Sequence, residues 1–439
     1  MPESSGYAVG GAGRAGAATA TDAVAGLMRD ISDVGADARR GGYSRPVFSP
    51  AETELRSWFT EQAERRGLDV HTDGNGIIWA WWDTATGTRR DAVVTGSHLD
   101  SVPGGGEYDG PLGVASALVA VDLLKTRGFR PRRPLAIAVF PEEEGSRFGV
   151  ACLGSRLLTG ALDPNKARNL KDADGNTYAD VAAKNGQDPR LIGADHKTLG
   201  QLGVFVELHV EQGRGLADLG QPVAIGSSIL GHGRWKLSVQ GQGNHAGTTL
   251  MKDRRDPMIA AAKIMIGIRD TAAKYRDARA TVGRLQPVPG GTNVIASRVD
   301  MWIDVRHPRD EVTAALVESI HLNAQVMAAE ENCTVTFGVE SLSPTVHFDA
   351  GLRDQLQAML PKSPVLDTGA GHDAGVLASH IPTAMLFVRN PTGISHSPEE
   401  LVEDADAEAG AVALADALAG LLGAARVLGS DLQAPPMMA

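Results

Sequence analysis

An apolar strand that runs straight into polar residues and a glycine-rich turn is the feature that most constrains the fold of this chain. The strand is predicted over residues 91–97, and a largely apolar helix from Leu112 to Lys125 follows the turn. Strands that are apolar on both faces are typical of sheets covered by helices on both sides. The pattern therefore predicts an α/β protein in which a buried strand leads into a helix.

The same alternation of strands and helices continues along the chain. Further apolar strands are predicted near residues 134–140, 204–210 and 383–388, with helical patterns between them. Connections that contain a helix are typical of parallel strands. We therefore expect a mostly parallel sheet that is flanked by helices.

A second set of elements interrupts this order between residues 229 and 342. It consists of strand, helix, strand, strand, helix and strand, predicted over residues 234–240, 256–275, 281–286, 299–306, 309–330 and 333–339. A chain of 439 residues is long for one hydrophobic core. We therefore predict an inserted α+β domain at residues 229–342, within a discontinuous larger domain formed by residues 21–228 and 343–430.

Composition and charge exclude several kinds of partner. The chain has 42 Lys and Arg residues against 53 Asp and Glu residues, a net charge of -11 without a dense basic patch, so we expect no nucleic-acid partner. Residues 1–20 are rich in glycine and alanine and lack the features of a signal peptide, and we predict a disordered tail there. The apolar run at 411–422 includes Asp416 and is predicted to be a helix packed on the sheet, so no membrane partner is expected.

The two cysteines, Cys152 and Cys333, are far apart in the sequence and do not form a disulfide framework. This usage fits the reducing cytoplasm, which is the expected location. Cys152 is a conceivable nucleophile, but we interpret it as a small buried thiol.

Polar side chains with metal-binding chemistry follow the first strand. His98 and Asp100 are two residues apart, so on a strand both side chains leave the same face, where the carboxylate could orient the imidazole. Asp109 lies in the glycine-rich turn beside Gly110. Each also has an ordinary interpretation, because His and Asp often form a simple hydrogen-bonded pair and aspartate is common in turns. The choice depends on whether other ligands reach the same place.

Further candidates follow other predicted strands. The acidic run Glu142–Glu144 comes directly after the strand at 134–140, and it is either solvated surface or part of a site at the sheet edge. His209 ends another strand and His396 precedes a helix start, although each alone could be structural. Two carboxylates and three histidines are the ligand types that two zinc-like ions need. We therefore predict a two-metal site at one edge of the sheet.

Six short motifs in one order identify the family that this chain resembles. They are Gly96-Ser-His-Leu-Asp-Ser-Val, Glu143-Glu-Gly-Ser-Arg-Phe, Glu207-Leu-His-Val-Glu-Gln-Gly, Asn244-His-Ala-Gly-Thr-Thr, Gly371-His-Asp-Ala and Ser395-His-Ser-Pro-Glu. From about Gly42 to about Gly423, the chain resembles the metallopeptidase family that includes the aminoacylases. Within that family it is most similar to the amidohydrolase branch of N-carbamoyl-L-amino acid hydrolases, beta-ureidopropionases and allantoate amidohydrolases.

The resemblance implies a role for each candidate ligand. Two divalent ions, which could be zinc, manganese or cobalt, would be bridged by Asp109, with His98 and His209 completing one site and Glu144 and His396 the other. Glu143 would be the general base, and Asp100 would be the catalytic-site partner of His98. A histidine at position 209, where the peptidase branches place a carboxylate, is what indicates the amidohydrolase branch.

The resemblance further implies that residues 229–342 form a lid and dimerisation domain. In the family, the equivalent of His245 reaches the active site from such a domain, often across a homodimer, and stabilises the oxyanion. The alternative is a loop histidine without a role.

Other residues resemble the substrate-binding groups of the family. Asn293 and Arg306 look like its substrate-binding pair, and the planar fork of arginine matches a free carboxylate next to the scissile bond. Gln212 resembles a residue that contacts the ureido end of the substrate. His232 and His372 could also line the pocket, although His372 is equally consistent with a structural role at a helix start.

The activity implied by the resemblance is hydrolysis of the carbamoyl C–N bond of an N-carbamoyl-L-amino acid or of allantoate. A metal-activated water with a free carboxylate beside it suits such an unreactive carbon. The alternatives are hydrolysis of an N-formyl or other N-acyl amino acid, and a peptidase activity, which His209 disfavours. A non-catalytic binding protein would be expected to have lost Glu143 or a ligand, and none is missing.

Overall fold

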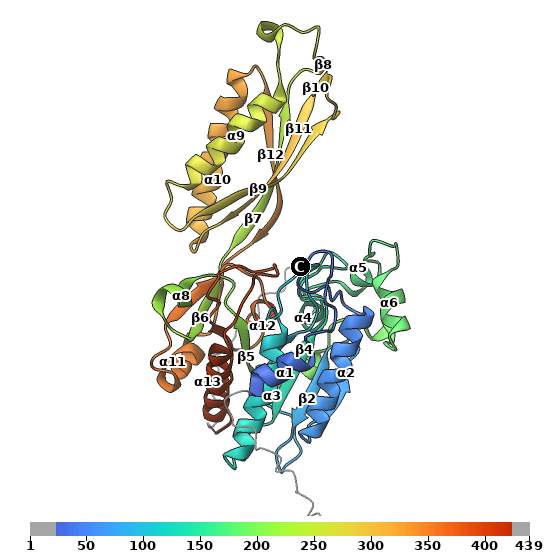
Figure 1. The fold of residues 1–439 in the computed structure, drawn as a ribbon, viewed down its shortest axis with the longest axis vertical. Helices are drawn as coiled ribbons and strands as arrows, with labels where there is room; N and C mark the ends of the chain where they lie inside the picture. Colours follow the sequence, from blue (N-terminus) through green and yellow to red (C-terminus); the bar gives the residue numbers. More distant parts are fainter. Residues whose placement is uncertain (1–22, 424–439) are drawn as a thin grey trace, which may run out of the picture.

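A computed structural model describes residues 23–423 of the protein, which form two parts (Figure 1). The larger part is built around a nine-stranded sheet, and the smaller part contains a four-stranded sheet and two long helices. The tail predicted at residues 1–20 lies outside the described residues. Within residues 23–423, no helix is both long enough and apolar enough to cross a membrane.

The large sheet has the strand order β1-β2-β4-β3-β5-β15-β6-β13, and β14 also pairs with β6. Its strands are β1 (Asp69–Thr72), β2 (Ile78–Trp82), β3 (Ala92–His98), β4 (Leu135–Phe140), β5 (Leu202–Val210), β6 (Val223–Ile229), β13 (Val346–His347), β14 (Val365–Thr368) and β15 (Thr383–Val388). The prediction of a largely parallel sheet is confirmed for the central strands β4, β3, β5 and β15. At the sides, β1, β2 and β13 pair antiparallel, and β6 is antiparallel to β15. Only antiparallel strands can be joined by a connection as short as that between β1 and β2.

Helices cover both faces of this sheet. On one face, α3 (Pro111–Thr126) and α13 (Asp404–Gly423) lie side by side, and α1 (Ala23–Asp30) packs against both (Figure 1). The other face carries α4 (Leu153–Thr159) and α12 (Asp373–Leu377). Because α3 is enclosed by the sheet and by two other helices, most of its side chains are buried, which explains its apolar sequence.

The large part contains further α-helices. They are α2 (Pro50–Arg65), α5 (Pro164–Arg168), α6 (Tyr178–Lys184), α7 (His196–Leu199), α8 (Gly215–Leu219) and α11 (Ala350–Met359). The side chain of Ser49 accepts the backbone N–H of Glu52, and Pro50 occupies the first turn of α2. Both features fix where this helix begins.

The small part lies between β6 and β13 in the sequence. Its antiparallel sheet has the order β12-β7-β11-β9, with strands β7 (His232–Gln240), β9 (Arg279–Val288), β11 (Arg298–Arg306) and β12 (Thr334–Ser343). Two helices, α9 (Pro257–Ala272) and α10 (Asp310–Glu330), pack on one face of this sheet. All six predicted elements are present in the predicted order. A two-stranded ribbon of β8 (Asn244–His245) and β10 (Val294–Ile295), which was not predicted, lies at the end farthest from the large sheet (Figure 1).

Candidate metal centre

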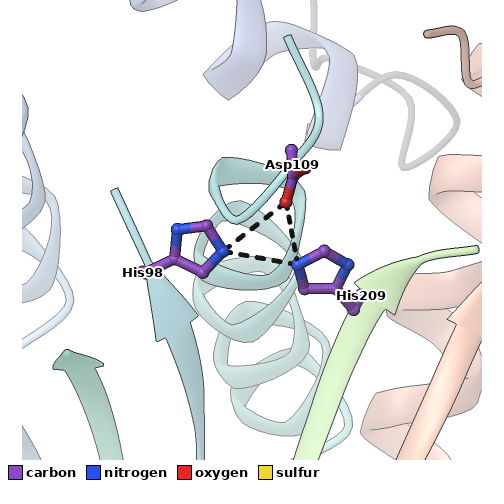
Figure 2. Close-up of side chains that lie close together, drawn as sticks. All are labelled: His98, Asp109 and His209. Atoms are coloured by element: carbon purple, nitrogen blue, oxygen red, sulfur yellow. Dashed lines mark hydrogen bonds and ion pairs between the residues drawn. The ribbon is translucent and has the colours of Figure 1, made fainter. Parts of the chain in front are cut away.

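Two histidines are delivered to one edge of the large sheet by neighbouring parallel strands. His98 is the last residue of β3, and His209 lies near the end of β5, which pairs with β3. Asp109 lies shortly before α3, the helix that follows β3. All three side chains are buried, and they point toward one another (Figure 2). Residues that are far apart in the sequence meet here because parallel strands end at the same edge of the sheet.

The nitrogen and oxygen atoms of this group have the spacing of metal ligands. His98 Nε2 lies 3.6 Å and His209 Nε2 lies 3.2 Å from Asp109 Oδ1, and the two Nε2 atoms are 3.4 Å apart (Figure 2). Two ligand atoms that are each about 2.0–2.1 Å from a tetrahedral zinc ion are about 3.3 Å from each other. The three atoms therefore fit around one ion.

The contacts on the far side of each imidazole fix its tautomer. His98 Nδ1 lies 2.9 Å from the carbonyl oxygen of Asp100, and His209 Nδ1 lies 3.0 Å from that of Val210. A carbonyl can only accept, so each Nδ1 carries a proton and each Nε2 of a neutral ring presents a lone pair. Burial lowers the pKa of His98 and His209, but the surrounding carboxylates outweigh it and raise both. The buried, electron-rich atoms thus attract positive charge, which a bound metal ion supplies.

Asp100 supports the site in a different way from the one predicted. Its carboxylate is 3.8 Å from His98 Nδ1, too far for a hydrogen bond, and its backbone carbonyl makes that contact instead. The carboxylate accepts the backbone N–H groups of Glu143 and Glu144, at 3.2 and 3.1 Å. The carboxylate makes no hydrogen bond to His98 because β3 ends at His98, so the two-residue period of a strand does not extend to Asp100. Asp100 thus joins the histidine to the acidic turn.

A second group lies on the other side of Asp109. His396 Nε2 is 3.4 Å from Asp109 Oδ2 and 3.3 Å from Glu144 Oε2. These spacings again fit the ligands of a single ion. The five predicted ligands therefore converge, and the two oxygens of Asp109 face the two groups separately.

The acidic run after β4 is buried. Glu142 and Glu143 are 0% and 5% exposed, so the alternative interpretation as solvated surface is wrong. The Glu142 carboxylate accepts two backbone N–H groups of the following turn, which makes it a structural residue. Glu143 Oε2 lies 3.8 Å from His98 Nε2, and its other oxygen contacts the thiol of Cys152, which is buried as predicted. Burial raises the pKa of Glu143 well above its usual range, although His98 opposes this.

A cavity of about 430 Å³ opens onto these groups, a size that suits a small ligand. The groups that line it include Asp109, Glu143, Glu144 and His396 at the metal-binding end, Gln212 and His372 from loops of the large part, and Arg234 and Arg306 from the small part. Gln212 Nε2 donates to Asp109 Oδ2 at 3.0 Å. His372 precedes α12 but its side chain makes no capping bond, and its ring centroid is 4.4 Å from that of His209. Burial and the charge of His209 lower the pKa of His372, so this ring is neutral.

Comparisons with known proteins agree with this geometry. The sequence profile of Peptidase family M20/M25/M40 matches residues 94–420. The chain belongs to this family. An N-carbamoyl-L-amino acid amidohydrolase of Geobacillus stearothermophilus is 35% identical, covering 88% of this chain and 95% of the relative, and an allantoate amidohydrolase of Escherichia coli (strain K12) is 31% identical, covering 88% and 94%. The crystal structure of an amidase of the hydantoinase/carbamoylase family from Burkholderia multivorans has a TM-score of 0.81 and 28% identity, covering 91% of this chain and 97% of that chain.

Two of the residues that were expected at the active site lie far from the cavity. His245 is in β8 and Asn293 directly precedes β10, in the ribbon at the outer end of the small part (Figure 1). Arg306 pairs with His232 at the inner end of β7, and the nine residues of β7 span about 26 Å at roughly 3.3 Å per residue. Within the described residues, neither His245 nor Asn293 lines the cavity. His232 lines a neighbouring cavity instead.

Arg234 lines the cavity but was not predicted as a site residue. It lies two residues after His232 on β7, on the exposed face of the small sheet. The alternation of polar and apolar residues along β7 indicates that face. The sequence does not reveal which end of the face lies over a cavity, because that depends on how the two parts of the protein are placed.

Proposed function

We propose that this member of Peptidase family M20/M25/M40 is an amidohydrolase that cleaves the carbamoyl C–N bond of an N-carbamoyl-L-amino acid or of allantoate. Hydrolysis would release ammonia and carbon dioxide with the amine product. The observation that carries the proposal is the convergence of two carboxylates and three histidines beside Glu143, a glutamate that is not among the ligands. The two amidohydrolase relatives support this reaction. His209 supports it through the family resemblance, which implies a carboxylate at this position in the peptidase branches.

We propose two divalent ions per chain, either zinc, manganese or cobalt. One would be held by His98 and His209 and the other by Glu144 and His396, with Asp109 between them. Imidazole and carboxylate ligands suit all three metals. When bound, such ions polarise a carbonyl group and make a water molecule more acidic.

Glu143 is proposed to move the proton. A carboxylate beside the metal ligands can take a proton from the attacking water and deliver it to the leaving nitrogen. Glu144 contacts His396, so the two adjacent glutamates divide the duties of base and ligand. Gln212, which already donates to Asp109, would contact the ureido end of the substrate, and His372 would line the same wall.

Replacement of the proposed base tests this assignment. We expect Glu143→Gln to retain about two divalent ions per chain by elemental analysis and to lose turnover by at least about 100-fold, because only proton transfer is removed. Glu61→Gln, on an exposed part of α2, is the matched control and should behave like the wild type. Turnover near the wild-type rate in Glu143→Gln would assign the base to another residue. A metal-free protein with full activity would overturn the metal-dependent mechanism.

A hydrolysis screen identifies the substrate class. The compounds are allantoate, several N-carbamoyl-L-amino acids, N-formyl-L-glutamate and a dipeptide. We expect release of ammonia from one of the first two classes. Hydrolysis of only the formyl compound would make the protein an N-acyl-L-amino acid hydrolase, and hydrolysis of only the dipeptide would make it a peptidase. A metal-loaded protein that hydrolyses none of them would be a binding protein on the same scaffold.

We further propose that residues 229–342 are an inserted lid and dimerisation domain and that the protein is a cytoplasmic homodimer. The two free, buried cysteines fit a reducing compartment. The position of His245 and Asn293 supports a dimer, because both lie at the opposite end of the small part from Arg306, which lines the cavity. In a dimer, these two residues would complete the cavity of the other subunit.

A further inference from the structure

The part of the cavity wall that belongs to the small sheet carries two arginines from adjacent strands. Arg306 ends β11, and Arg234 lies on the neighbouring strand β7. Asp304 is directly opposite Arg234 in the register and two residues before Arg306, so all three side chains project from the same face. The Asp304 carboxylate therefore contacts the guanidinium groups of both arginines.

Arg306 is firmly engaged with the protein. Its Nε donates to Asp304 Oδ1 at 2.7 Å and its Nη2 donates to Oδ2 at 3.0 Å, which is a bidentate pair. Its Nη1 donates to the backbone carbonyl of Gly369, a residue that lines the same cavity. The charge of Arg306 is thus balanced by Asp304, and its guanidinium group is held in one orientation.

Arg234 is much less engaged. Its contact with Asp304 is a single long one, 3.4 Å from Nε to Oδ2, and 59% of its side chain is exposed. Its Nη1 and Nη2 groups donate no hydrogen bond to any residue between positions 23 and 423. Because Asp304 is already paired with Arg306, the two arginines bring one unbalanced positive charge to the cavity.

We propose that Arg234 offers this charge to the carboxylate of the substrate and forms a two-arginine clamp with Arg306. The free Nη1 and Nη2 edge of Arg234 would bind the carboxylate in a bidentate manner, while Asp304 keeps Arg306 beside it. The clamp differs from the pair of Arg306 and Asn293 implied by the family resemblance, because both of its arginines belong to one subunit and line the same cavity. The inference rests on the proposed function and names the residue that selects substrates with a free carboxylate.

Binding can be measured apart from turnover in the metal-loaded Glu143→Gln protein. Titration calorimetry with N-carbamoyl-L-alanine and with allantoate, each compared with its carboxamide, gives the dissociation constants. For the carboxylate that binds more tightly, we expect Arg234→Gln to raise Kd about 10- to 100-fold, because a hydrogen-bonded charge pair is lost. The Kd of the carboxamide should stay within about twofold, since it carries no charge to pair with arginine.

A second substitution tests whether the affinity lost in Arg234→Gln is due to the lost positive charge and not to the altered shape of the side chain. In the Arg234→Gln background, Asp304→Asn removes the charge that balances Arg306, so Kd for the carboxylate should fall at least about fivefold from its value in Arg234→Gln alone. Arg284→Gln is the matched control, because Arg284 lies on β9 over the ring of Trp302 on the same sheet and does not line the cavity. Its Kd should equal that of the parent protein.

Two results would overturn the clamp. One is an equal Kd in Arg234→Gln and its parent, and the other is a double variant that binds no more tightly than Arg234→Gln. Both are distinct from failure of the proposed function. Carboxylates that bind through Arg234 but are not hydrolysed by the metal-loaded wild type would contradict only the reaction. If neither carboxylate binds, the reaction and the clamp both fail.

Discussion

At the scale of single residues, backbone contacts hold the two buried histidine ligands in place and leave one ring nitrogen of each free. The Nδ1–H groups of His98 and His209 are bound by main-chain carbonyls, so their Nε2 atoms face Asp109. Asp100 connects two elements, because its carbonyl accepts the Nδ1–H of His98 and its carboxylate accepts the backbone N–H groups of Glu143 and Glu144. The positions of these two histidines thus follow from the course of the main chain at the strand ends, and a bound metal would add to an arrangement that is already built.

Glu142 makes the stability of the metal-free protein depend on pH. Burial, and then the charge of Asp100, raises the pKa of Glu142 to about 8 from an ordinary value of 4.5. Between these two values the folded protein holds a proton that the unfolded chain has lost, so stability falls as pH rises, by up to about 1.4 kcal/mol per pH unit. A glutamine at position 142 does not titrate, so Glu142→Gln removes this difference in bound protons between the folded and unfolded states. We therefore expect the free energy of unfolding of Glu142→Gln, relative to the wild type, to increase between pH 5.5 and about 7.5.

Urea unfolding of the metal-free proteins at three pH values in this window measures the effect. Glu61→Gln, at an exposed position of α2, is the matched control. Its stability relative to the wild type should change little with pH. Parallel pH profiles for Glu142→Gln and the wild type would show that Glu142 is ionised in the folded protein across the window.

At the scale of secondary structure, one glycine allows the two central strands to approach. Gly96 of β3 has φ +145°, and a Cβ atom there would lie 1.9 Å from the carbonyl oxygen of Ala138 in β4. An alanine would force the strands apart two residues before His98. We expect Gly96→Ala to lower the free energy of unfolding by about 3 kcal/mol and to reduce the metal content, because the ligand at the end of β3 is displaced.

Gly283→Ala is the control for Gly96→Ala. Gly283 also lies in a strand, β9, but an added Cβ atom meets no described residue within 4 Å. Its substitution should change the free energy of unfolding by less than about 0.5 kcal/mol. Thermal unfolding and elemental analysis of the two variants provide the comparison. Equal stability and metal content would show that β3 and β4 tolerate a side chain between them.

The strands that carry the site could be predicted because their burial leaves a strong pattern. The segment predicted at 383–388 coincides with β15, all of whose residues are buried. By contrast, β1 was not predicted, since it is a short edge strand with no buried residue and hence no apolar run. The ribbon of β8 and β10 has two residues in each strand, too few for any period to show.

The convergence of the five proposed metal ligands could be predicted from the sequence, but their individual contacts could not. Ligands such as His98 and His209 follow strands whose ends meet in any parallel sheet, so their convergence could be inferred. The contacts of Asp100 depend on the exact residue at which β3 ends, which sequence patterns do not define. The position of Arg234 at the cavity depends on the placement of the small part over the large one, for which the sequence has no signal.

At the scale of the whole molecule, the two parts are joined where β6 passes into β7 and where β12 passes into β13 (Figure 1). A hydrogen bond links these two connections, because the Thr345 hydroxyl accepts the N–H of Gly231 at 2.9 Å. Asp310, the first residue of α10, accepts the N–H and the hydroxyl of Thr345. These hydrogen bonds join both connections to α10 of the small part. They keep the cavity wall near the metal-binding groups, while the ribbon with His245 stays at the opposite end.

In the proposed homodimer, that geometry predicts complementation between two inactive variants. His245→Ala and Glu143→Gln should each lose most activity as homodimers. If His245 completes the cavity of the other subunit, a mixed dimer contains one site in which both residues are intact, so its activity should be about half that of the wild type. Co-expression with two different affinity tags and purification on both isolates the mixed dimer. Dimers of Glu143→Gln with Glu143→Ala are the control, because neither site of that pair has a base. If the mixed dimer of His245→Ala with Glu143→Gln is as inactive as this control, His245 does not act across a dimer.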